Sequence, residues 1–215
     1  GAEYRVAGID KKEARKNPLP PFTTSTLQQT ASQRFHFPAA LTMRFAQQLY
    51  ETGLITYHRT DSLNLAQSAL FAAKDFISKE YGPTYWAGFP RQFKTKSKGA
   101  QEAHEAIRPA FAEASAGKPT FPHPEQLKRL TPQQAKLYNL IWRRFIASQM
   151  SQAIFDATTV DILAKNYTFR ANGQTLKFDG FLKVYPMKFE ETDLPLLEKD
   201  EVLELKELIP SQHFT

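Results

Sequence analysis

The chain has 215 residues, of which 41% are hydrophobic and 13% aromatic, so it can bury a core and is not globally disordered. It contains no cysteine, which excludes disulfides, thiolate metal sites and cysteine nucleophiles. No apolar run approaches the roughly 18 residues of a membrane-spanning helix, and no signal peptide opens the chain. We therefore expect a soluble intracellular protein, or a piece of one, with no membrane partner.

The net charge of +6 is distributed unevenly. Residues 1–110 carry 15 Lys and Arg against 9 Asp and Glu, whereas residues 111–215 carry 13 of each kind. Four cations of the first half fall within eight positions: Arg91, Lys94, Lys96 and Lys98. Such an excess favours a polyanionic partner, usually nucleic acid, but ordinary surface solubility explains it equally well. The charge alone therefore leaves the partner open.

The first part of the chain predicts one strand followed by helices. Residues 3–9 read as a strand, and the prolines of residues 18–21 indicate a linker. Beyond the linker, apolar residues recur at helical spacing behind capping residues, which predicts helices over three ranges: 38–53, 65–81 and 131–150. Residues 82–100 and 112–124 read as loops between them.

From about residue 157 the hydrophobic period changes to two, which is typical of strands. Strands are predicted over four ranges: 158–163, 167–170, 174–185 and 201–209. Asn172-Gly173 is expected to form a hairpin turn, because both residues tolerate positive φ. Residues 190–207 hold eight acidic residues and two lysines, which indicates a solvated edge that nucleic acid would avoid.

Together these patterns predict an α+β protein in which a mainly helical domain is inserted into a small antiparallel β domain. The β domain is expected to comprise residues 1–21 and 151–215, and the helical domain residues 22–150. In this interpretation the strand of residues 3–9 pairs with the C-terminal strands.

Reactive side chains are concentrated just after the helix that ends near Gly53. In an extended segment Tyr57, Arg59 and Asp61 point to one side, which places a phenol, a phosphate-binding guanidinium and a carboxylate on one face. That set suits phosphoryl transfer to tyrosine. Most such triplets are nevertheless ordinary surface residues, so the pattern by itself is weak.

A second cluster occupies residues 101–109. On a helical turn His104 and Arg108 would lie one above the other, and both can donate hydrogen bonds to an anion. The plain alternative is a surface histidine in an ion-paired turn. No His/Asp/Glu metal cluster, glycine-rich phosphate loop or Ser-His-Asp arrangement stands out in the sequence.

Three motifs in this order, PFTTSTLQQ at 21–29, GLITYHRTDS at 53–62 and QEAHEAIRP at 101–109, resemble those of type IA DNA topoisomerases, in particular the bacterial members. Residues 140–150 and 178–181 fit the same pattern, so the resemblance runs from about residue 3 to 215. It implies a central fragment of an enzyme that cleaves and religates one DNA strand to relax negative supercoils.

The resemblance also implies roles for individual residues. Tyr57 would be the nucleophile that forms a 5′-phosphotyrosyl bond, and Arg59 would hold the scissile phosphate. His104 would contact a phosphate, Arg108 would be its basic neighbour, and Asp61 would orient Arg59 or the DNA strand. Lys94, Lys96 and Lys98 are expected to contribute to DNA binding.

In this family a Toprim domain supplies the acidic Mg²⁺-binding cluster, a general-acid glutamate and a lysine, and no such pattern occurs here. We therefore expect no metal site in this chain, single-stranded DNA and the remaining domains of the same polypeptide as partners, and a cytoplasmic, nucleoid-associated location. The end of the chain at 209–215 is expected to be a cut, and the fragment to be inactive alone.

Two other functions stay open at this stage. The chain could be a stand-alone single-stranded DNA-binding module without catalysis. It could also be an unrelated phosphoryl-transfer enzyme with a tyrosine intermediate, which would need a metal or acid cluster of its own.

Overall fold

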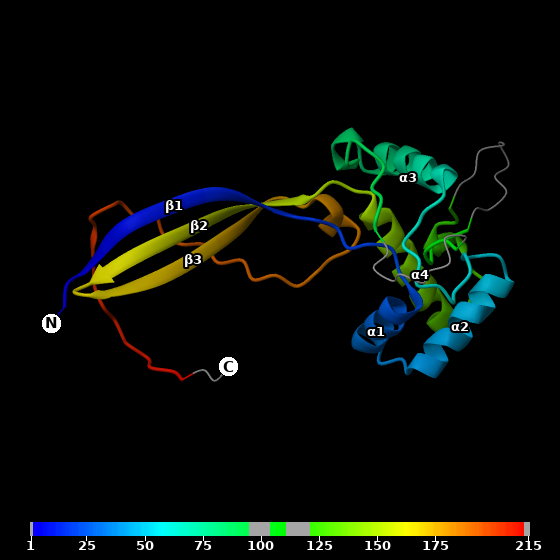
Figure 1. Ribbon diagram of the computed structural model, residues 1–215, viewed down its shortest axis with the longest axis horizontal. Helices are drawn as coiled ribbons and strands as arrows, with labels where there is room; N and C mark the ends of the chain where they lie inside the picture. Colours follow the sequence, from blue (N-terminus) through cyan, green and yellow to red (C-terminus); the bar gives the residue numbers. More distant parts are fainter. Residues whose placement is uncertain (1, 95–103, 111–120, 213–215) are drawn as a thin grey trace. The chain divides into compact units, whose positions relative to one another are not determined.

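The computed structural model describes residues 2–94, 104–110 and 121–212, and they form two compact units (Figure 1). The β unit comprises Gly1–Lys16, Ile154–Phe178 and Lys188–Thr215, and the helical unit comprises Asn17–Ala153 and Asp179–Met187. The predicted α+β class, with a helical region inserted into a β region, is confirmed.

The helical unit contains α1 (Thr24–Phe35), α2 (Ala39–Glu51), α3 (Gln67–Glu80) and α4 (Pro132–Ser148), with short 3-10 helices η1 (Pro83–Tyr85), η2 (Pro124–Gln126) and η3 (Gly180–Lys183). The three helices predicted from hydrophobic spacing are therefore present. α4 begins with a capping box between Thr131 and Gln134, and ten of its 17 residues are buried. Because α4 packs against α1, α2, η2 and η3, it is the central element of this core.

The segment Asp179–Met187 belongs to the helical unit, although 151–215 as a whole was predicted to be β. The chain leaves β geometry at Gly180, which has φ 48° and leaves no room for a Cβ because the carbonyl of Gln152 lies where it would be. The buried guanidinium of Arg144 then lies between the rings of Phe22 and Tyr185, 4.3 and 4.5 Å from their centroids. These cation–π contacts attach the returning chain to α4.

The β unit is a four-stranded sheet in the order β3-β2-β1-β4, built from β1 (Tyr4–Lys16), β2 (Ala153–Ala164), β3 (Tyr167–Phe178) and β4 (Val202–Leu203). β2 pairs with β3 and β1 with β4, both antiparallel. The pairing of the N-terminal strand with C-terminal strands is thus confirmed. β1 extends through the charged residues to Lys16, whereas the strand predicted at 201–209 is reduced to two residues.

The predicted hairpin turn at Asn172-Gly173 is wrong. Both residues lie within β3, opposite Thr159 and Thr158, and the chain turns instead at residues 165–166, where Lys165 has φ 53°. Gly173 has another role, because a Cβ there would come within 2.8 Å of the Thr192 carbonyl and the Leu194 side chain. The glycine accommodates a passing segment rather than a turn.

Candidate active site

The candidate site is built on the extended segment between α2 and α3. On one side Thr24, at the start of α1, holds this segment by hydrogen bonds to residues 58 and 60. Its N–H donates to the Thr60 carbonyl (2.8 Å), its hydroxyl donates to the His58 carbonyl (2.9 Å), and the Thr60 N–H donates to that hydroxyl (2.9 Å). The start of α1 therefore fixes the backbone beside Tyr57.

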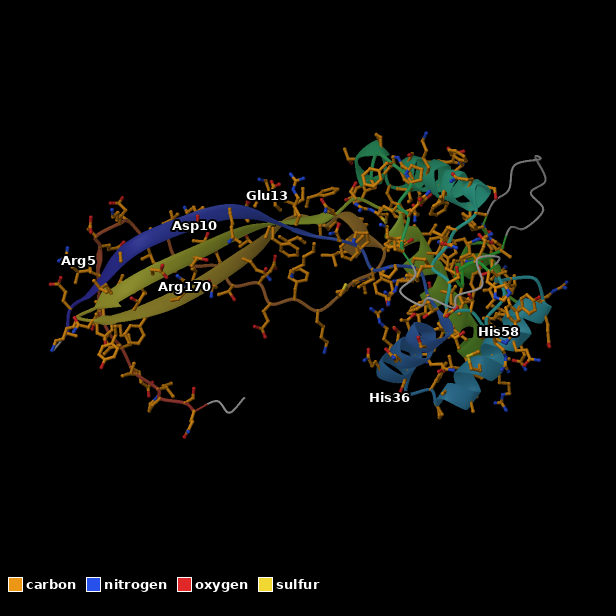
Figure 2. All side chains as sticks on the ribbon, in the orientation of Figure 1. Arg5, Asp10, Glu13, His36, His58 and Arg170 are labelled. Carbon is orange, nitrogen blue, oxygen red and sulfur yellow. The ribbon has the colours of Figure 1, made fainter. Side chains whose placement is uncertain are left out.

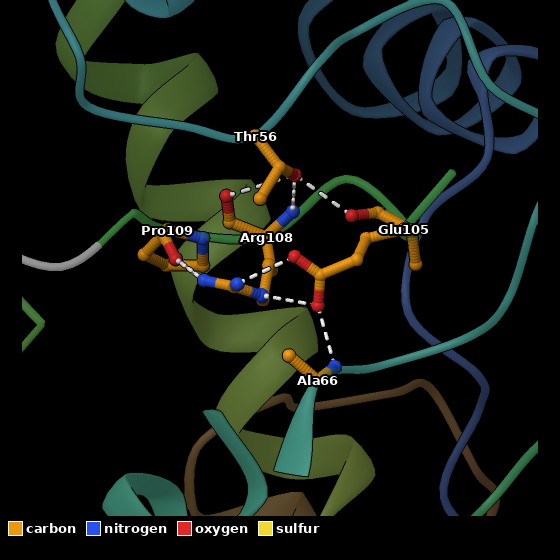
Figure 3. A network of polar contacts seen from close by, with 6 residues as sticks. Thr56, Ala66, Glu105, Arg108 and Pro109 are labelled. Atoms are coloured by element: carbon orange, nitrogen blue, oxygen red, sulfur yellow. Dashed lines mark hydrogen bonds and ion pairs between the residues drawn. The ribbon is translucent and has the colours of Figure 1, made fainter. Parts of the chain in front are cut away.

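On its other side the segment is bonded to residues 104–110. The Thr56 N–H donates to the Arg108 carbonyl (2.9 Å), and the Thr56 hydroxyl donates to the Ala106 carbonyl (2.7 Å). The Ala106 N–H donates to the Asn64 carbonyl (2.9 Å). The stretch around Tyr57 is thus braced from both sides without belonging to a helix or a strand. Figure 3 shows the contacts of Thr56 on the second side.

Burial alternates strictly along residues 57–62. The Tyr57 side chain is 40% exposed and Arg59 and Asp61 are exposed, whereas His58, Thr60 and Ser62 are buried. Alternate residues of an extended chain face opposite sides, so this alternation agrees with the predicted common face of Tyr57, Arg59 and Asp61, although the chain bends at residues 58 and 59.

Three rings surround the Tyr57 phenol. Tyr50, His58 and His104 lie with ring centroids 5.4, 5.4 and 5.7 Å from that of Tyr57, all in edge-to-face geometry. The contact with His104 joins the two clusters that the sequence placed apart. Tyr50, on the last turn of α2, is a contact that the sequence analysis missed, since only the fold brings it to Tyr57. Edge-to-face packing restricts the orientation of the phenol.

A pocket of about 520 Å³ lies beside the tyrosine, lined by residues of the first turns of α1, of the extended segment and of the second cluster: Thr24, Ser25, Gln28, Arg59, Thr60, Asp61 and His104. Among the described residues, no carboxylate forms an ion pair with Arg59 within 4.0 Å. The positive end of α1 adds to the guanidinium, so the pocket suits an anion such as a phosphate group.

His58, which is labelled in Figure 2, is buried. Neither ring nitrogen has a hydrogen-bond partner among the described residues. Burial lowers the pKa of His58, the neighbouring Arg59 lowers it further, and Glu51 opposes the shift. The imidazole is therefore a neutral packing element under Tyr57 and Tyr50 at neutral pH.

The predicted helical turn around Arg108 is wrong for the part that the structure describes. Residues 104–110 are extended, with bridges pairing Ile107 to Phe22 and Pro109 to Ile55. Arg108 is 5% exposed and is held in a forked ion pair with Glu105 at 2.6 and 3.2 Å.

The contacts of Arg108 are internal to this braced region. A third nitrogen donates to the Pro109 carbonyl (2.8 Å), and Glu105 also accepts from the Ala66 N–H (Figure 3). In this structure Arg108 therefore stabilises the braced region, and its contact with DNA stays a prediction.

One of the three lysines predicted to bind DNA lies among the described residues. Lys94 is exposed, whereas Lys96 and Lys98 lie outside the described residues. Among the residues described, no three His, Asp or Glu side chains come together to hold a metal ion.

Comparison with known proteins places these features in a family. The family model described as DNA topoisomerase matches residues 1–215. The chain is 43% identical over 217 residues to DNA topoisomerase 1 of Haemophilus influenzae, covering 100% of this chain and 24% of that protein.

A solved structure shows the same fold. Full-length topoisomerase I from Thermotoga maritima superimposes with a TM-score of 0.77 at 33% identity, over 94% of this chain and 32% of that one. In the described part of this chain, none of the helices has the length and hydropathy to cross a membrane. The chain spans about a quarter of the Haemophilus relative's length, and it belongs to the DNA topoisomerase family.

Proposed function

We propose that this chain carries the nucleophile of a type IA DNA topoisomerase, which cleaves and rejoins one DNA strand and thereby relaxes negative supercoils. The observation that carries the proposal is the position of Tyr57. It is exposed, in ring contact with His104, and on the same face as Arg59, which lines an open pocket with His104. A phosphodiester in that pocket would meet two hydrogen-bond donors, Arg59 and His104, and Tyr57 is in ring contact with the second of them.

In the proposed step, the Tyr57 oxygen attacks the phosphorus of a single-stranded phosphodiester. A bond from Oη to phosphorus forms, and the bond from phosphorus to the 3′-oxygen breaks. The products are a 5′-phosphotyrosine and a free 3′-hydroxyl, so the phenol loses one proton and the leaving oxygen gains one. Attack by the 3′-hydroxyl reverses both changes and rejoins the strand.

The other pocket residues would divide the remaining work. Arg59 would bind the non-bridging oxygens and stabilise the charge that develops on them. His104 would donate to a phosphate oxygen while its ring orients Tyr57, and Asp61 would orient Arg59 or the strand. Positioning of this kind accounts for much of the rate in phosphoryl transfer.

The proposal assigns two tasks to parts of a longer protein. Protonation of the leaving 3′-oxygen typically contributes about 10² to 10⁴ in rate, and a general acid and Mg²⁺ would come from a Toprim domain. The 215-residue chain is therefore expected to bind single-stranded DNA weakly and not to relax plasmids alone. Its cellular location would be the cytoplasm, at the nucleoid.

A chimera tests this division. The corresponding segment of the Haemophilus influenzae relative is replaced by this chain, and relaxation of negatively supercoiled plasmid is measured. We expect relaxation by the chimera, none by its Tyr57→Phe variant and none by the isolated chain. A folded chimera that binds DNA but does not relax it would favour the alternative function, a single-stranded DNA-binding module without catalysis.

A further inference from the structure

A second pocket of the helical unit, of about 370 Å³, lies further along the segment that carries Tyr57. It is lined on one side by Leu63, Asn64 and Leu65, which follow Asp61 directly, and on the other by residues 91–94 before α4. A volume of this size falls within the range of sites for small organic molecules, such as one nucleotide.

The two pockets lie next to each other along one stretch of the chain. Arg59, Thr60 and Asp61 line the first pocket and residues 63–65 line the second. At about 3.3 Å per residue, Arg59 and Leu63 are at most about 13 Å apart along an extended chain. A short single strand whose phosphate occupies the first pocket can therefore reach the second.

The charge of the second pocket is positive. Arg91 and Lys94 line it, and among the described residues no acidic side chain lines it or forms an ion pair with either cation. Two cations without an acidic partner attract a phosphate group.

Arg91 is held in place by a buried glutamine. The Arg91 N–H donates to Gln149 Oε1 (3.0 Å), and Gln149 Nε2 donates to the Arg91 carbonyl (3.2 Å). Arg91 Nε donates to the Met150 carbonyl (3.3 Å), which fixes the side chain as well. Gln149 is fully buried, so this support is rigid. Burial also lowers the pKa of Arg91, as expected for a guanidinium partly removed from water.

The rest of the lining is apolar or amide-bearing. Phe93, Leu63 and Leu65 are half-buried and offer an aromatic ring and two aliphatic side chains. Asn64 and Gln92 are exposed and carry both donors and acceptors. Any of the four bases can stack on such a ring, and the exposed side-chain amides can form hydrogen bonds with the edge of the base.

We propose that this pocket binds one nucleotide of the single-stranded DNA near the scissile phosphate, with the phosphate on Arg91 and Lys94 and the base against Phe93. The inference rests on the proposed function for its substrate and extends it by a subsite. An acidic peptide would use the two cations but not the combination of ring, aliphatic side chains and amides, so a nucleotide fits the lining better.

The test is a fluorescence-anisotropy titration of a labelled oligothymidylate of about 12 nucleotides with the 215-residue chain, over a range of salt concentrations. The double variant Arg91→Gln/Lys94→Gln is expected to bind about tenfold more weakly and to lower the slope of log K against log salt by about 1.4. Phe93→Leu is expected to weaken binding about fivefold without changing that slope.

The matched control is Lys128→Gln/Arg129→Gln, which removes two exposed cations that line another pocket of the same unit. It is expected to change affinity and slope much less. Thermal melting of each variant checks the fold. If Arg91→Gln unfolds the chain, the two single variants Phe93→Leu and Lys94→Gln replace the double variant.

Equal losses from both double variants would overturn the proposal, because they would show a diffuse charge effect. Displacement of the oligonucleotide by polyglutamate at the same concentration of charge would assign the pocket to acidic peptides and would also overturn it. The chimera could fail to relax plasmid while the Arg91→Gln/Lys94→Gln variant still binds the oligonucleotide more weakly. That result would refute the proposed function but not the subsite.

Discussion

Five cations of the β unit pair with carboxylates, whereas among the described residues three cations that line pockets of the helical unit do not. In the β unit, Figure 2 shows charged side chains along the strands, and five cations are paired with carboxylates: Arg5 with Glu3, Arg15 with Glu13, Arg170 with Asp161, Lys177 with Glu13 and Asp156, and Lys206 with Glu204. In the helical unit, Arg59, Arg91 and Lys94 line pockets, and no described carboxylate pairs with them.

This difference shows where a polyanion can bind. A cation that is already paired offers little net attraction to a phosphate, whereas an unpaired cation in a pocket gains a partner when DNA arrives. The net charge of the whole chain hides this distinction. The following predictions test it, beginning with the largest expected effect.

The strongest effect is expected at an ion pair of the helical unit that contains a buried arginine, the pair of Arg108 with Glu105. Glu105→Ala leaves the Arg108 guanidinium buried without its carboxylate and removes an acceptor from the Ala66 N–H. The free energy of unfolding should fall by about 3 kcal/mol in urea denaturation. Asp161→Ala breaks an exposed pair in the β unit and should change it little. A loss at Asp161 as large as at Glu105 would contradict the comparison.

The next effect separates the two kinds of arginine in DNA binding. Arg59→Gln should weaken binding of single-stranded oligonucleotide about tenfold, because one charge-assisted contact to phosphate is lost. Arg170→Gln, which removes the same charge from an ion-paired position, should leave affinity nearly unchanged. Both are measured by anisotropy at one fixed salt concentration. Equal losses would mean that net charge, rather than pairing, controls binding.

A smaller effect is expected at Tyr50, which packs edge-to-face on Tyr57. In the chimera, Tyr50→Leu should slow formation of the covalent DNA adduct about fivefold, since one oriented ring contact is lost. Tyr50→Phe should retain the wild-type rate, and neither variant should change affinity for DNA. An unchanged adduct rate in Tyr50→Leu would show that this contact does not position the nucleophile.

The smallest effect concerns pH. The pKa of buried His58 lies below its ordinary value of 6.5, so the unfolded state binds its proton more readily. The contribution of neutral His58 to the free energy of unfolding is fully present above pH 6.5. It is lost as the pH falls from 6.5 through the lower pKa of the folded state. His58→Phe should therefore make the unfolding free energy less dependent on pH between about 7 and 5. Melting curves at both pH values measure this dependence, with His36→Phe as an exposed-histidine control. An equal change of unfolding free energy with pH in wild type and His58→Phe would contradict the prediction.

Several features could be predicted from the sequence because they depend on local patterns. The helices followed from apolar spacing and from caps such as Thr131 with Gln134. The common face of Tyr57, Arg59 and Asp61 followed from the two-residue repeat of an extended chain, and the burial of His58, Thr60 and Ser62 agrees with it.

The features that were wrong or missed depend on tertiary contacts. Asn172-Gly173 has good turn chemistry, but β3 continues through it because Gly173 must admit the segment at Thr192. Arg108 looked like a basic residue on a helical turn, but bridges to Phe22 and Ile55 hold its segment extended. The contact of Tyr50 with Tyr57 arises only when α2 ends beside the extended segment.

The most direct test of the central claim is to identify the residue that becomes bonded to DNA. The chimera is incubated with a single-stranded oligonucleotide, denatured, digested with trypsin and nuclease, and analysed by mass spectrometry. We predict one modified peptide, with a nucleotide attached through phosphate to Tyr57, and none in the Tyr57→Phe variant. An adduct on Tyr50 or any other residue, or an adduct that persists in Tyr57→Phe, would contradict the assignment of Tyr57 as the nucleophile.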